Sequence, residues 1–387
     1  MSLVELPHTG HTSVRGNSTN DIQQLRPSET TVAQVLKDAG YATALIGKWG
    51  LGDEGTASQP NDKGFDSFFG YLNQSHAHNH YPDFLWSDKT RFPLTNKVTV
   101  SGRSQSGFPV GATPIAERRE YVEDLFRQRA LDYIDANKGR PFFLYLSIVS
   151  PHANNEAKSL GTNAMEVPSY GPYASRDWPE TAKGYAAMVG HIDETVGQIM
   201  QKLKALGIED DTIVVFTSDN GVHAEGGNDP TFLKSSGPLR GIKRDLTEGG
   251  IRVPFIVWAP GRAQAGRTSD HVGYFADIMP TAAQLARTRS PATDGLSFAS
   301  LINGTAAPRH QHLYWEFYEK SGQAVRMGQW KAVREPMLTG PIQLYDLSSD
   351  IGEKRDVAAR HPDLVARAKA IMEREHVPDP RWKVSGG

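Results

Sequence analysis

Residues 40–52, GYATALIGKWGLG, join a short apolar run to a single lysine set among glycines. The run at 41–46 is rich in apolar and β-forming residue types and predicts a buried strand. Lys48 follows at the end of that strand, where glycines let the backbone approach a ligand closely. A lysine there can serve as a point charge for a phosphate or sulfate oxygen, although a lone lysine at a strand end is often simply solvated.

Further apolar runs alternate with helical patterns along the chain. Helices are predicted from an N-cap at Ser28 to about Gly40, at 117–137 and at 181–206, and strands at 142–149, 212–217 and 253–260. The segments 53–116 and 153–180 lack a sustained period and are predicted to be long loops. This alternation predicts an α/β fold, with a mostly parallel central sheet flanked by helices.

The pattern changes near residue 306. Short strands are predicted within 312–318, 323–334 and 342–348, and a helix over 361–376. We therefore expect two units, an α/β domain at residues 1–305 and a small C-terminal α+β subdomain at 306–387. The subdomain should consist of a small antiparallel sheet plus one helix.

Composition excludes several classes of function. Lys and Arg number 42 against 44 Asp and Glu, a formal net charge of -2, so no global field favours nucleic acid or an anionic membrane. The chain has no cysteine, which excludes disulfides, thiolate zinc sites and a cysteine nucleophile among these residues. No apolar stretch approaches the roughly 18–20 residues that span a bilayer. We expect no nucleic-acid partner and no membrane span, and oligomeric state is not indicated.

Polar residues follow three of the predicted strands: Lys48, His152, and the pair Asp219 and Asn220. Ligands bind beyond the carboxyl ends of strands in open α/β sheets, so these side chains should converge. Asp219 and Asn220 offer hard oxygen donors that suit Ca²⁺ or Mg²⁺, although Asp-Asn-Gly is also a common turn sequence. His152 can donate to a leaving oxygen, and a structural histidine is an equally good interpretation.

Two other segments carry candidate residues. The cluster HAHNH at 76–80 could line a pocket, and we take His78 and His80, together with His223, as candidates for substrate binding. The segment PLRGIKRDLTEGGIRVP at 238–254 places basic residues around a glycine pair before a strand. From that segment we select Lys243 as a second anion-binding residue, while a solvated loop explains the other cations.

These blocks together resemble the sulfatases, specifically the arylsulfatase A-like branch of the alkaline phosphatase superfamily. GYATALIGKWGLG is similar to the family pattern G-Y-x-T-x-x-x-G-K-W-H-x-G. SPH at 150–152, SDNG at 218–221, the block at 238–254 and YDLSSDIGEKRDVA at 345–358 resemble later family blocks in the same order. The resemblance runs from about residue 8 to about residue 375.

The resemblance implies hydrolysis of a sulfate ester by a formylglycine nucleophile with a divalent cation, usually Ca²⁺. Carried over by motif, Lys48 and Lys243 would bind the sulfate and His152 would contact or protonate the leaving oxygen. Asp219 and Asn220 would bind the metal. The implied substrate is a sulfated small molecule or sulfated glycan, and the implied location is periplasmic or extracellular.

The chain departs from the family pattern in two places. The nucleophile signature, C-x-P-S-R or S-x-P-x-R, and the strand with metal-binding aspartates before it should precede the segment that residues 8–16 resemble. Neither is present there, so we expect an N-terminally truncated chain that is inactive by itself and binds metal weakly. SGPLR, beginning at Ser236, fits S-x-P-x-R formally but lies far from the expected position.

The second departure is Gly50, which stands where relatives have the histidine of K-W-H. We hypothesise that His78 takes over the role of that histidine. Two alternatives to a sulfatase remain open. One is a phosphodiesterase or phosphonate hydrolase of the same superfamily, and the other is a non-catalytic protein that binds sulfated glycans.

Overall fold

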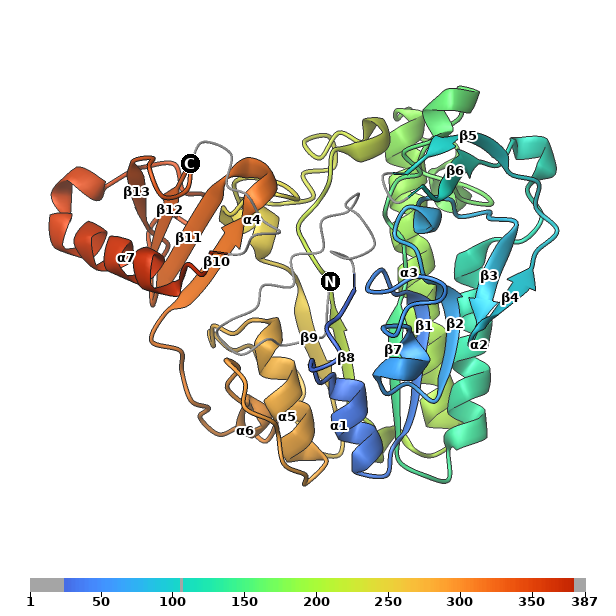
Figure 1. Ribbon diagram of the computed structural model, residues 1–387, viewed down its shortest axis with the longest axis horizontal. Coiled ribbons are helices and arrows are strands. Elements are labelled where there is room, and N and C mark those ends of the chain that lie inside the picture. The colour runs from blue at the N-terminus through green and yellow to red at the C-terminus, as the bar shows by residue number, and fades with distance from the viewer. Residues whose placement is uncertain (1–23, 105–106, 379–387) are drawn as a thin grey trace.

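The computed structural model describes residues 24–104 and 107–378. Figure 1 shows an α/β body whose central strands lie between helices, and a separate antiparallel sheet with one long helix at the other end of the molecule. The α/β class and the C-terminal antiparallel sheet plus helix are therefore confirmed. The boundary at residue 305 remains a prediction.

The central sheet has five strands in the order β4-β3-β2-β1-β7. β1 pairs in parallel with β2 and with β7, whereas β3 and β4 continue the sheet in antiparallel pairs. The strands are β1 (Ala42–Lys48), β2 (Ser67–Tyr71), β3 (Phe84–Ser87), β4 (Thr90–Pro93) and β7 (Phe142–Ser147). The prediction that 53–116 forms only loops is wrong, because β2, β3 and β4 all lie inside it.

Four other strands form two separate pairs. β5 (Thr99–Arg103) pairs with β6 (Pro109–Ala112), and β8 (Val214–Thr217) pairs with β9 (Phe255–Trp258), both antiparallel. β8 and β9 match the strands predicted at 212–217 and 253–260, but they pair with each other instead of joining the parallel strands. Val215, Phe255 and Ile256 on this pair are 42%, 45% and 58% exposed.

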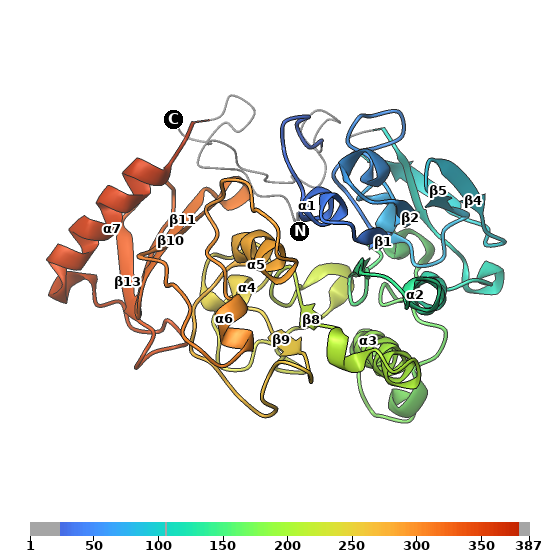
Figure 2. The ribbon, with the colours of Figure 1, turned by 90° about the horizontal axis from the view of Figure 1, so that it is seen from below.

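Helices lie on both sides of the central strands. Figure 2 shows α1 on one side of β1, and α2 and α3 on the other side. The helices of this body are α1 (Val32–Asp38), α2 (Val122–Asn137), α3 (Glu180–Ala205), α4 (Glu248–Ile251), α5 (Ile278–Leu285) and α6 (Ala299–Ile302).

The predicted N-cap of the first helix is wrong, because α1 is capped by Thr31 and not by Ser28. The Thr31 hydroxyl accepts the Gln34 amide at 3.1 Å, and the Gln34 side chain accepts the Thr31 amide at 2.8 Å. This reciprocal capping box satisfies two amides that a helix start would otherwise leave unpaired.

The C-terminal sheet has the order β10-β11-β12-β13, and α7 (Pro362–Glu375) packs on it through Ala368, Ile371 and Met372. Its strands are β10 (Leu313–Phe317), β11 (Gly322–Met327), β12 (Trp330–Arg334) and β13 (Ile342–Asp346). The fully buried Lys331 on β12 donates to Glu248 of α4 at 2.9 Å. This buried ion pair connects the C-terminal sheet to the helix that follows the Lys243 loop.

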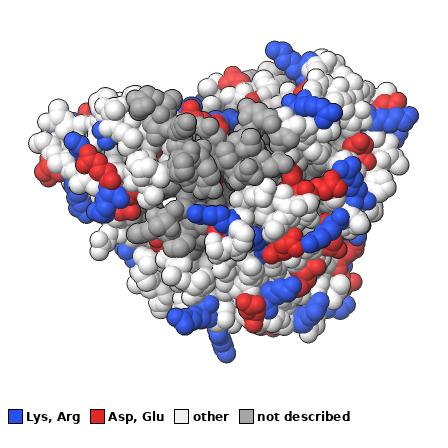
Figure 3. Space-filling model, viewed as in Figure 1, with Lys and Arg blue, Asp and Glu red and all other residues white. Residues whose placement is uncertain are grey.

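The visible surface agrees with the near-zero net charge. Figure 3 shows basic and acidic side chains interspersed over the described part of this face, without one large field of either sign. Among the described helices, none combines the length and the apolar character that crossing a membrane requires.

Candidate functional site

The predicted site residues lie at the carboxyl ends of strands. Lys48 is the last residue of β1, His152 follows β7 through a turn, and Asp219 and Asn220 follow β8 after one residue, Ser218. Burial lowers the pKa of Lys48 to about 8, while the nearby Asp219 carboxylate opposes that change and Lys243 adds to it. The structure thus brings residues from three strand ends within electrostatic reach of one another.

His152 and Lys243 are in direct contact. The Lys243 Nζ lies 3.1 Å from Nε2 of His152, and the other ring nitrogen, Nδ1, lies 2.8 Å from the carbonyl oxygen of Ala153. That carbonyl can only accept, so Nδ1 carries the proton and Nε2 accepts from the lysine. Burial, with Lys48 and Lys243 nearby, holds the pKa of His152 well below its usual range, so the ring is neutral near pH 7.

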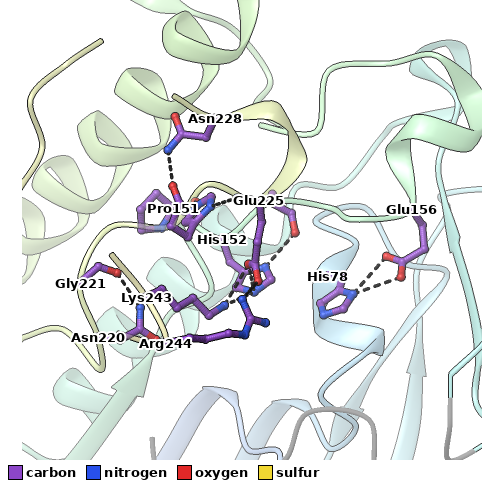
Figure 4. Close-up of polar contacts among 12 residues, drawn as sticks. His78, Pro151, His152, Glu156, Asn220, Gly221, Glu225, Asn228, Lys243 and Arg244 are labelled. Atoms are coloured by element: carbon purple, nitrogen blue, oxygen red, sulfur yellow. Dashed lines mark hydrogen bonds and ion pairs between the residues drawn. The ribbon is translucent and has the colours of Figure 1, made fainter. Parts of the chain in front are cut away.

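Glu225 completes this group, and the sequence did not point to it. Its carboxylate accepts from Lys243 at 2.9 Å and from Arg244 at 2.7 Å, and it lies 3.2 Å from Nε2 of His152 (Figure 4). Burial opposes ionisation, but Lys243 and Arg244 outweigh it and lower the pKa of Glu225 to about 2. A single acidic residue in an irregular loop carries no periodic or motif signal, which is why it was missed.

Asp219 and Asn220 present oxygen atoms near this group. Burial alone would raise the pKa of Asp219, but the positive charges around it, Lys48 and Lys243 among them, lower it overall. The Asn220 amide nitrogen donates to the Gly221 carbonyl at 2.8 Å, so the amide oxygen is the atom that can bind a ligand (Figure 4).

Asp219 and Asn220 provide the oxygen ligands that a hard cation prefers, but two ligands are too few to hold it. Ca²⁺ takes about six to eight oxygen ligands, and two side chains supply only a part of that set. Within residues 24–104 and 107–378, no group of three or more His, Cys, Asp or Glu side chains could hold a metal ion. The site therefore fits a metal only if further oxygen ligands are supplied.

The three histidines of HAHNH have different environments. His78 lies 3.1 Å from the Glu156 carboxylate, and its ring stacks on His152 at a centroid distance of 5.2 Å, so it borders the site. His80 is fully buried and its Nε2 donates to the His152 carbonyl at 2.8 Å, so it helps to fix the backbone of His152. His76 is buried among aromatic rings.

His223 holds two loops together. Its Nε2 donates to the Pro151 carbonyl at 2.8 Å, and its Nδ1 accepts the backbone amide of Glu225 at 3.1 Å. Burial lowers the pKa of His223, which agrees with a neutral ring that donates at one nitrogen and accepts at the other. The loops that follow β7 and β8 are therefore joined at the site.

Gly50 lies beside Lys48, and there is room for a Cβ on its Cα. A Cβ built there would meet only the Lys48 Cε and the Gln74 side chain, at 3.8 Å each. Its φ of +74° is a conformation that residues other than glycine rarely adopt. A side chain would fit in volume but would strain the backbone.

Comparison with known proteins gives two family matches. The family described as "Sulfatase" matches residues 4–288, and "N-sulphoglucosamine sulphohydrolase, C-terminal" matches residues 242–375. N-acetylgalactosamine-6-sulfatase from Mus musculus is 32% identical over 315 residues, covering 79% of this chain and 54% of that protein. Arylsulfatase G from Mus musculus is 30% identical over 368 residues, covering 84% and 63%.

Solved structures agree with these matches. Ps i-CgsB in complex with k-i-k-neocarrahexaose is similar with a TM-score of 0.69 and 26% identity, covering all of this chain and 80% of that one. This chain spans about half the length of the N-acetylgalactosamine-6-sulfatases that it matches.

Proposed function

The chain belongs to the sulfatase family, and on that premise we propose that the protein hydrolyses sulfate esters at the site formed by Lys48, His152, Asp219, Asn220 and Lys243. The observation that carries this proposal is that Lys48, His152, Asp219 and Asn220, which follow or end β1, β7 and β8, converge with Lys243 from the loop before α4. A sulfate ester is a monoanion with oxygens that lysine point charges can bind.

In this proposal Lys48 and Lys243 bind the sulfate oxygens. Lys48 keeps its charge at pH 7 even though its pKa is lowered to about 8. Lys243 already donates to Nε2 of His152, so these two residues can share the proton that the leaving oxygen needs. As a neutral ring with its proton on Nδ1, His152 can donate to that oxygen only after Nε2 is protonated.

We propose Ca²⁺, with Mg²⁺ as the alternative, as the cofactor. The Asp219 carboxylate and the Asn220 amide oxygen would hold it, and a bound cation would neutralise charge on the sulfate. Further oxygen ligands would have to complete the set. Weak metal binding by the 387-residue chain is the expected result.

We further propose that the whole protein uses a formylglycine and that this 387-residue polypeptide does not turn over sulfate esters by itself. It contains no cysteine, and its one formal S-x-P-x-R match begins at Ser236. The Ser236 hydroxyl interacts with the Gly241 carbonyl, at 3.5 Å, in the loop that leads to Lys243. Formylglycine at Ser236 in intact-peptide mass spectrometry, or turnover by the isolated chain, would contradict this proposal.

His78 is our candidate for the role of the histidine that Gly50 replaces. Its ring is stacked on His152 and is bonded to Glu156, so it can exchange a proton at the edge of the site. In the active full-length protein, His78→Ala should change the pH-rate profile. An unchanged profile would remove His78 from the mechanism.

The substrate that we propose is a sulfated small molecule or sulfated glycan, in an exported protein. Turnover of a sulfate ester and of the matching phosphate ester by the full-length protein, with Lys48→Ala and Lys243→Ala as variants, tests the reaction. We expect sulfate turnover that falls by at least about 100-fold in each variant. Preferential turnover of the phosphate ester would instead favour a phosphodiesterase or phosphonate hydrolase.

One observation favours a second candidate, a non-catalytic protein that binds sulfated glycans. The anion site is present although these residues include no cysteine nucleophile. Binding of a sulfated oligosaccharide without turnover by the full-length protein would establish this candidate and exclude the first.

A further inference from the structure

The Glu225 carboxylate lies where an incoming anion would be expected to bind. It contacts Lys243 and Arg244 and lies 3.2 Å from Nε2 of His152, and its side chain is only 15% exposed. In Figure 4 the side chain points into the space between these three basic groups. Two of its partners, Lys243 and His152, are residues that the proposed function needs for sulfate.

The turn that carries Glu225 is held firmly. The Glu225 amide donates to His223, whose other ring nitrogen bonds the Pro151 carbonyl. The next residue, Gly226, has φ +62°, and a Cβ there would lie 2.6 Å from Ala164 and 2.7 Å from Ala153. Only glycine fits this turn, so the fold itself directs the carboxylate toward Lys243.

Arg244 is placed to bind an anion next to Lys243. Its φ of +79° is unusual for a residue with a side chain. Its guanidinium donates from Nη1 to Glu225 at 2.7 Å and from Nε to Glu319 at 3.3 Å, and the side chain is 42% exposed. A planar group with several donors is well suited to an oxyanion.

We propose that Arg244 is a third cation of the anion site and that Glu225 is its resident counter-ion, which the sulfate of the ligand displaces from Lys243 and Arg244. This inference rests on the proposed function, because it takes the ligand to be a sulfate ester. Carboxylate and sulfate oxygens accept the same hydrogen bonds, so the two groups compete for the same donors. The apparent affinity for sulfate is then reduced by the free energy of separating Glu225 from both cations.

The test measures binding of inorganic sulfate to the 387-residue chain by isothermal titration calorimetry. Glu225→Gln should raise the affinity at least tenfold, because it keeps the shape and removes the competing charge. The matched control is Glu319→Gln, which removes the same charge from the other side of Arg244 but does not touch Lys243. We expect less than a threefold change in that control.

Adding Arg244→Gln to the Glu225→Gln variant should abolish most of the gain. Equal gains in Glu225→Gln and Glu319→Gln would overturn the inference, because the effect would then be general electrostatics. So would an unchanged affinity in Glu225→Gln. If Lys48→Ala still weakens sulfate binding in that case, the proposed anion site stands without the role of Glu225.

A second measurement does not depend on the folding of any variant. In the wild-type chain labelled with ¹⁵N-arginine, the Nη1–H resonance of Arg244 should shift during sulfate titration, since the partner of that nitrogen changes from the Glu225 carboxylate to sulfate. A resonance that does not move at saturating sulfate would overturn the inference.

Discussion

His76 is a buried histidine whose two ring nitrogens have no hydrogen-bond partner among the described residues. Its ring centroid lies 4.6 Å from that of Phe84, 4.9 Å from Phe108 and 5.0 Å from Tyr71. Burial, with a smaller effect of Arg91, lowers the pKa of His76 to about 3. The residue is therefore part of an aromatic core cluster and not a candidate for the pocket rim.

Because the pKa of His76 is lowered, the folded protein should lose stability at acidic pH, and the substitution His76→Phe should remove that loss. The folded state keeps the ring neutral, whereas the unfolded ring takes up a proton below about pH 6.5, so stability is lost as the pH falls. At pH 5 the loss is about 2 kcal/mol. Urea unfolding should show His76→Phe gaining about that much relative to wild type between pH 8 and pH 5. A constant difference between the two proteins would contradict this account.

Glu123 has the opposite pH dependence. Its carboxylate accepts the amides of Val149 and Ser150 at 3.0 and 2.7 Å, just before His152, and burial raises its pKa to about 7. The protonated form is thus favoured in the folded state, and its contribution to stability is lost as the pH rises from about 4.5 through 7.

Glu123→Gln should remove this loss while keeping an oxygen acceptor for both amides. Relative to wild type, the variant should gain up to about 3 kcal/mol in the free energy of unfolding between pH 4 and pH 8. Urea titrations at the two pH values measure it. If the wild type and the variant lose stability in parallel, the pKa of Glu123 is the same in the folded and unfolded states.

At the scale of elements, the sequence patterns predicted the positions of several strands and helices but not every strand of the central sheet. β1, β7, β8 and β9 were predicted because each is a continuous apolar run, and α1 to α3 because their apolar residues recur with a helical period. β2, SFFGY, is more buried than β7, β8 and β9 but lies in a segment rich in Gly, Pro and Asp, which hides it. One glycine of β2 is required by the structure. A Cβ on Gly70 would lie 1.8 Å from the Gly47 carbonyl oxygen, so this strand keeps a residue that weakens its sequence signal.

The residues of the candidate site were likewise predicted only in part. The strand-end rule predicted that Lys48, His152 and Asp219 would converge, because parallel strands end at one edge of a sheet. Glu225 and Arg244 could not be predicted, because their positions depend on the loop after β8 and on contacts with other segments.

The cap of α1 gives a direct test at this scale. Thr31→Ala should cost about 1–2 kcal/mol, because it removes the capping bond to Gln34 and a hydrogen bond to the Lys63 carbonyl. The exposed Ser28, which the sequence pattern predicted as the cap, serves as a matched control, and Ser28→Ala should change stability by less than about 0.5 kcal/mol. Thermal unfolding measures both. A larger loss in Ser28→Ala than in Thr31→Ala would assign the cap to Ser28.

At the scale of the whole molecule, the sheet β4-β3-β2-β1-β7 and the pair β8-β9 both carry site residues but do not pair with each other among the described residues. Among the described residues β7 pairs only with β1, and β8 pairs only with β9, although the loops after β7 and β8 are bonded through His223. Both faces of β7 pack on apolar clusters, yet all six of its residues remain half-buried. The edge of β7 that faces away from β1 has no strand partner among the described residues.

This edge of β7, which is unpaired among the described residues, predicts uneven hydrogen exchange within one sheet. Alternate amides of β7 point to β1 and the others to the edge, whereas β1 is paired on both sides. The edge amides of β7 should exchange at least about 100-fold faster than those of β1 in the folded protein. β12, which is paired on both sides in the C-terminal sheet, is the internal control and should exchange as slowly as β1. Equal protection of β7 and β1, measured by amide-resolved NMR, would mean that the edge is covered in solution.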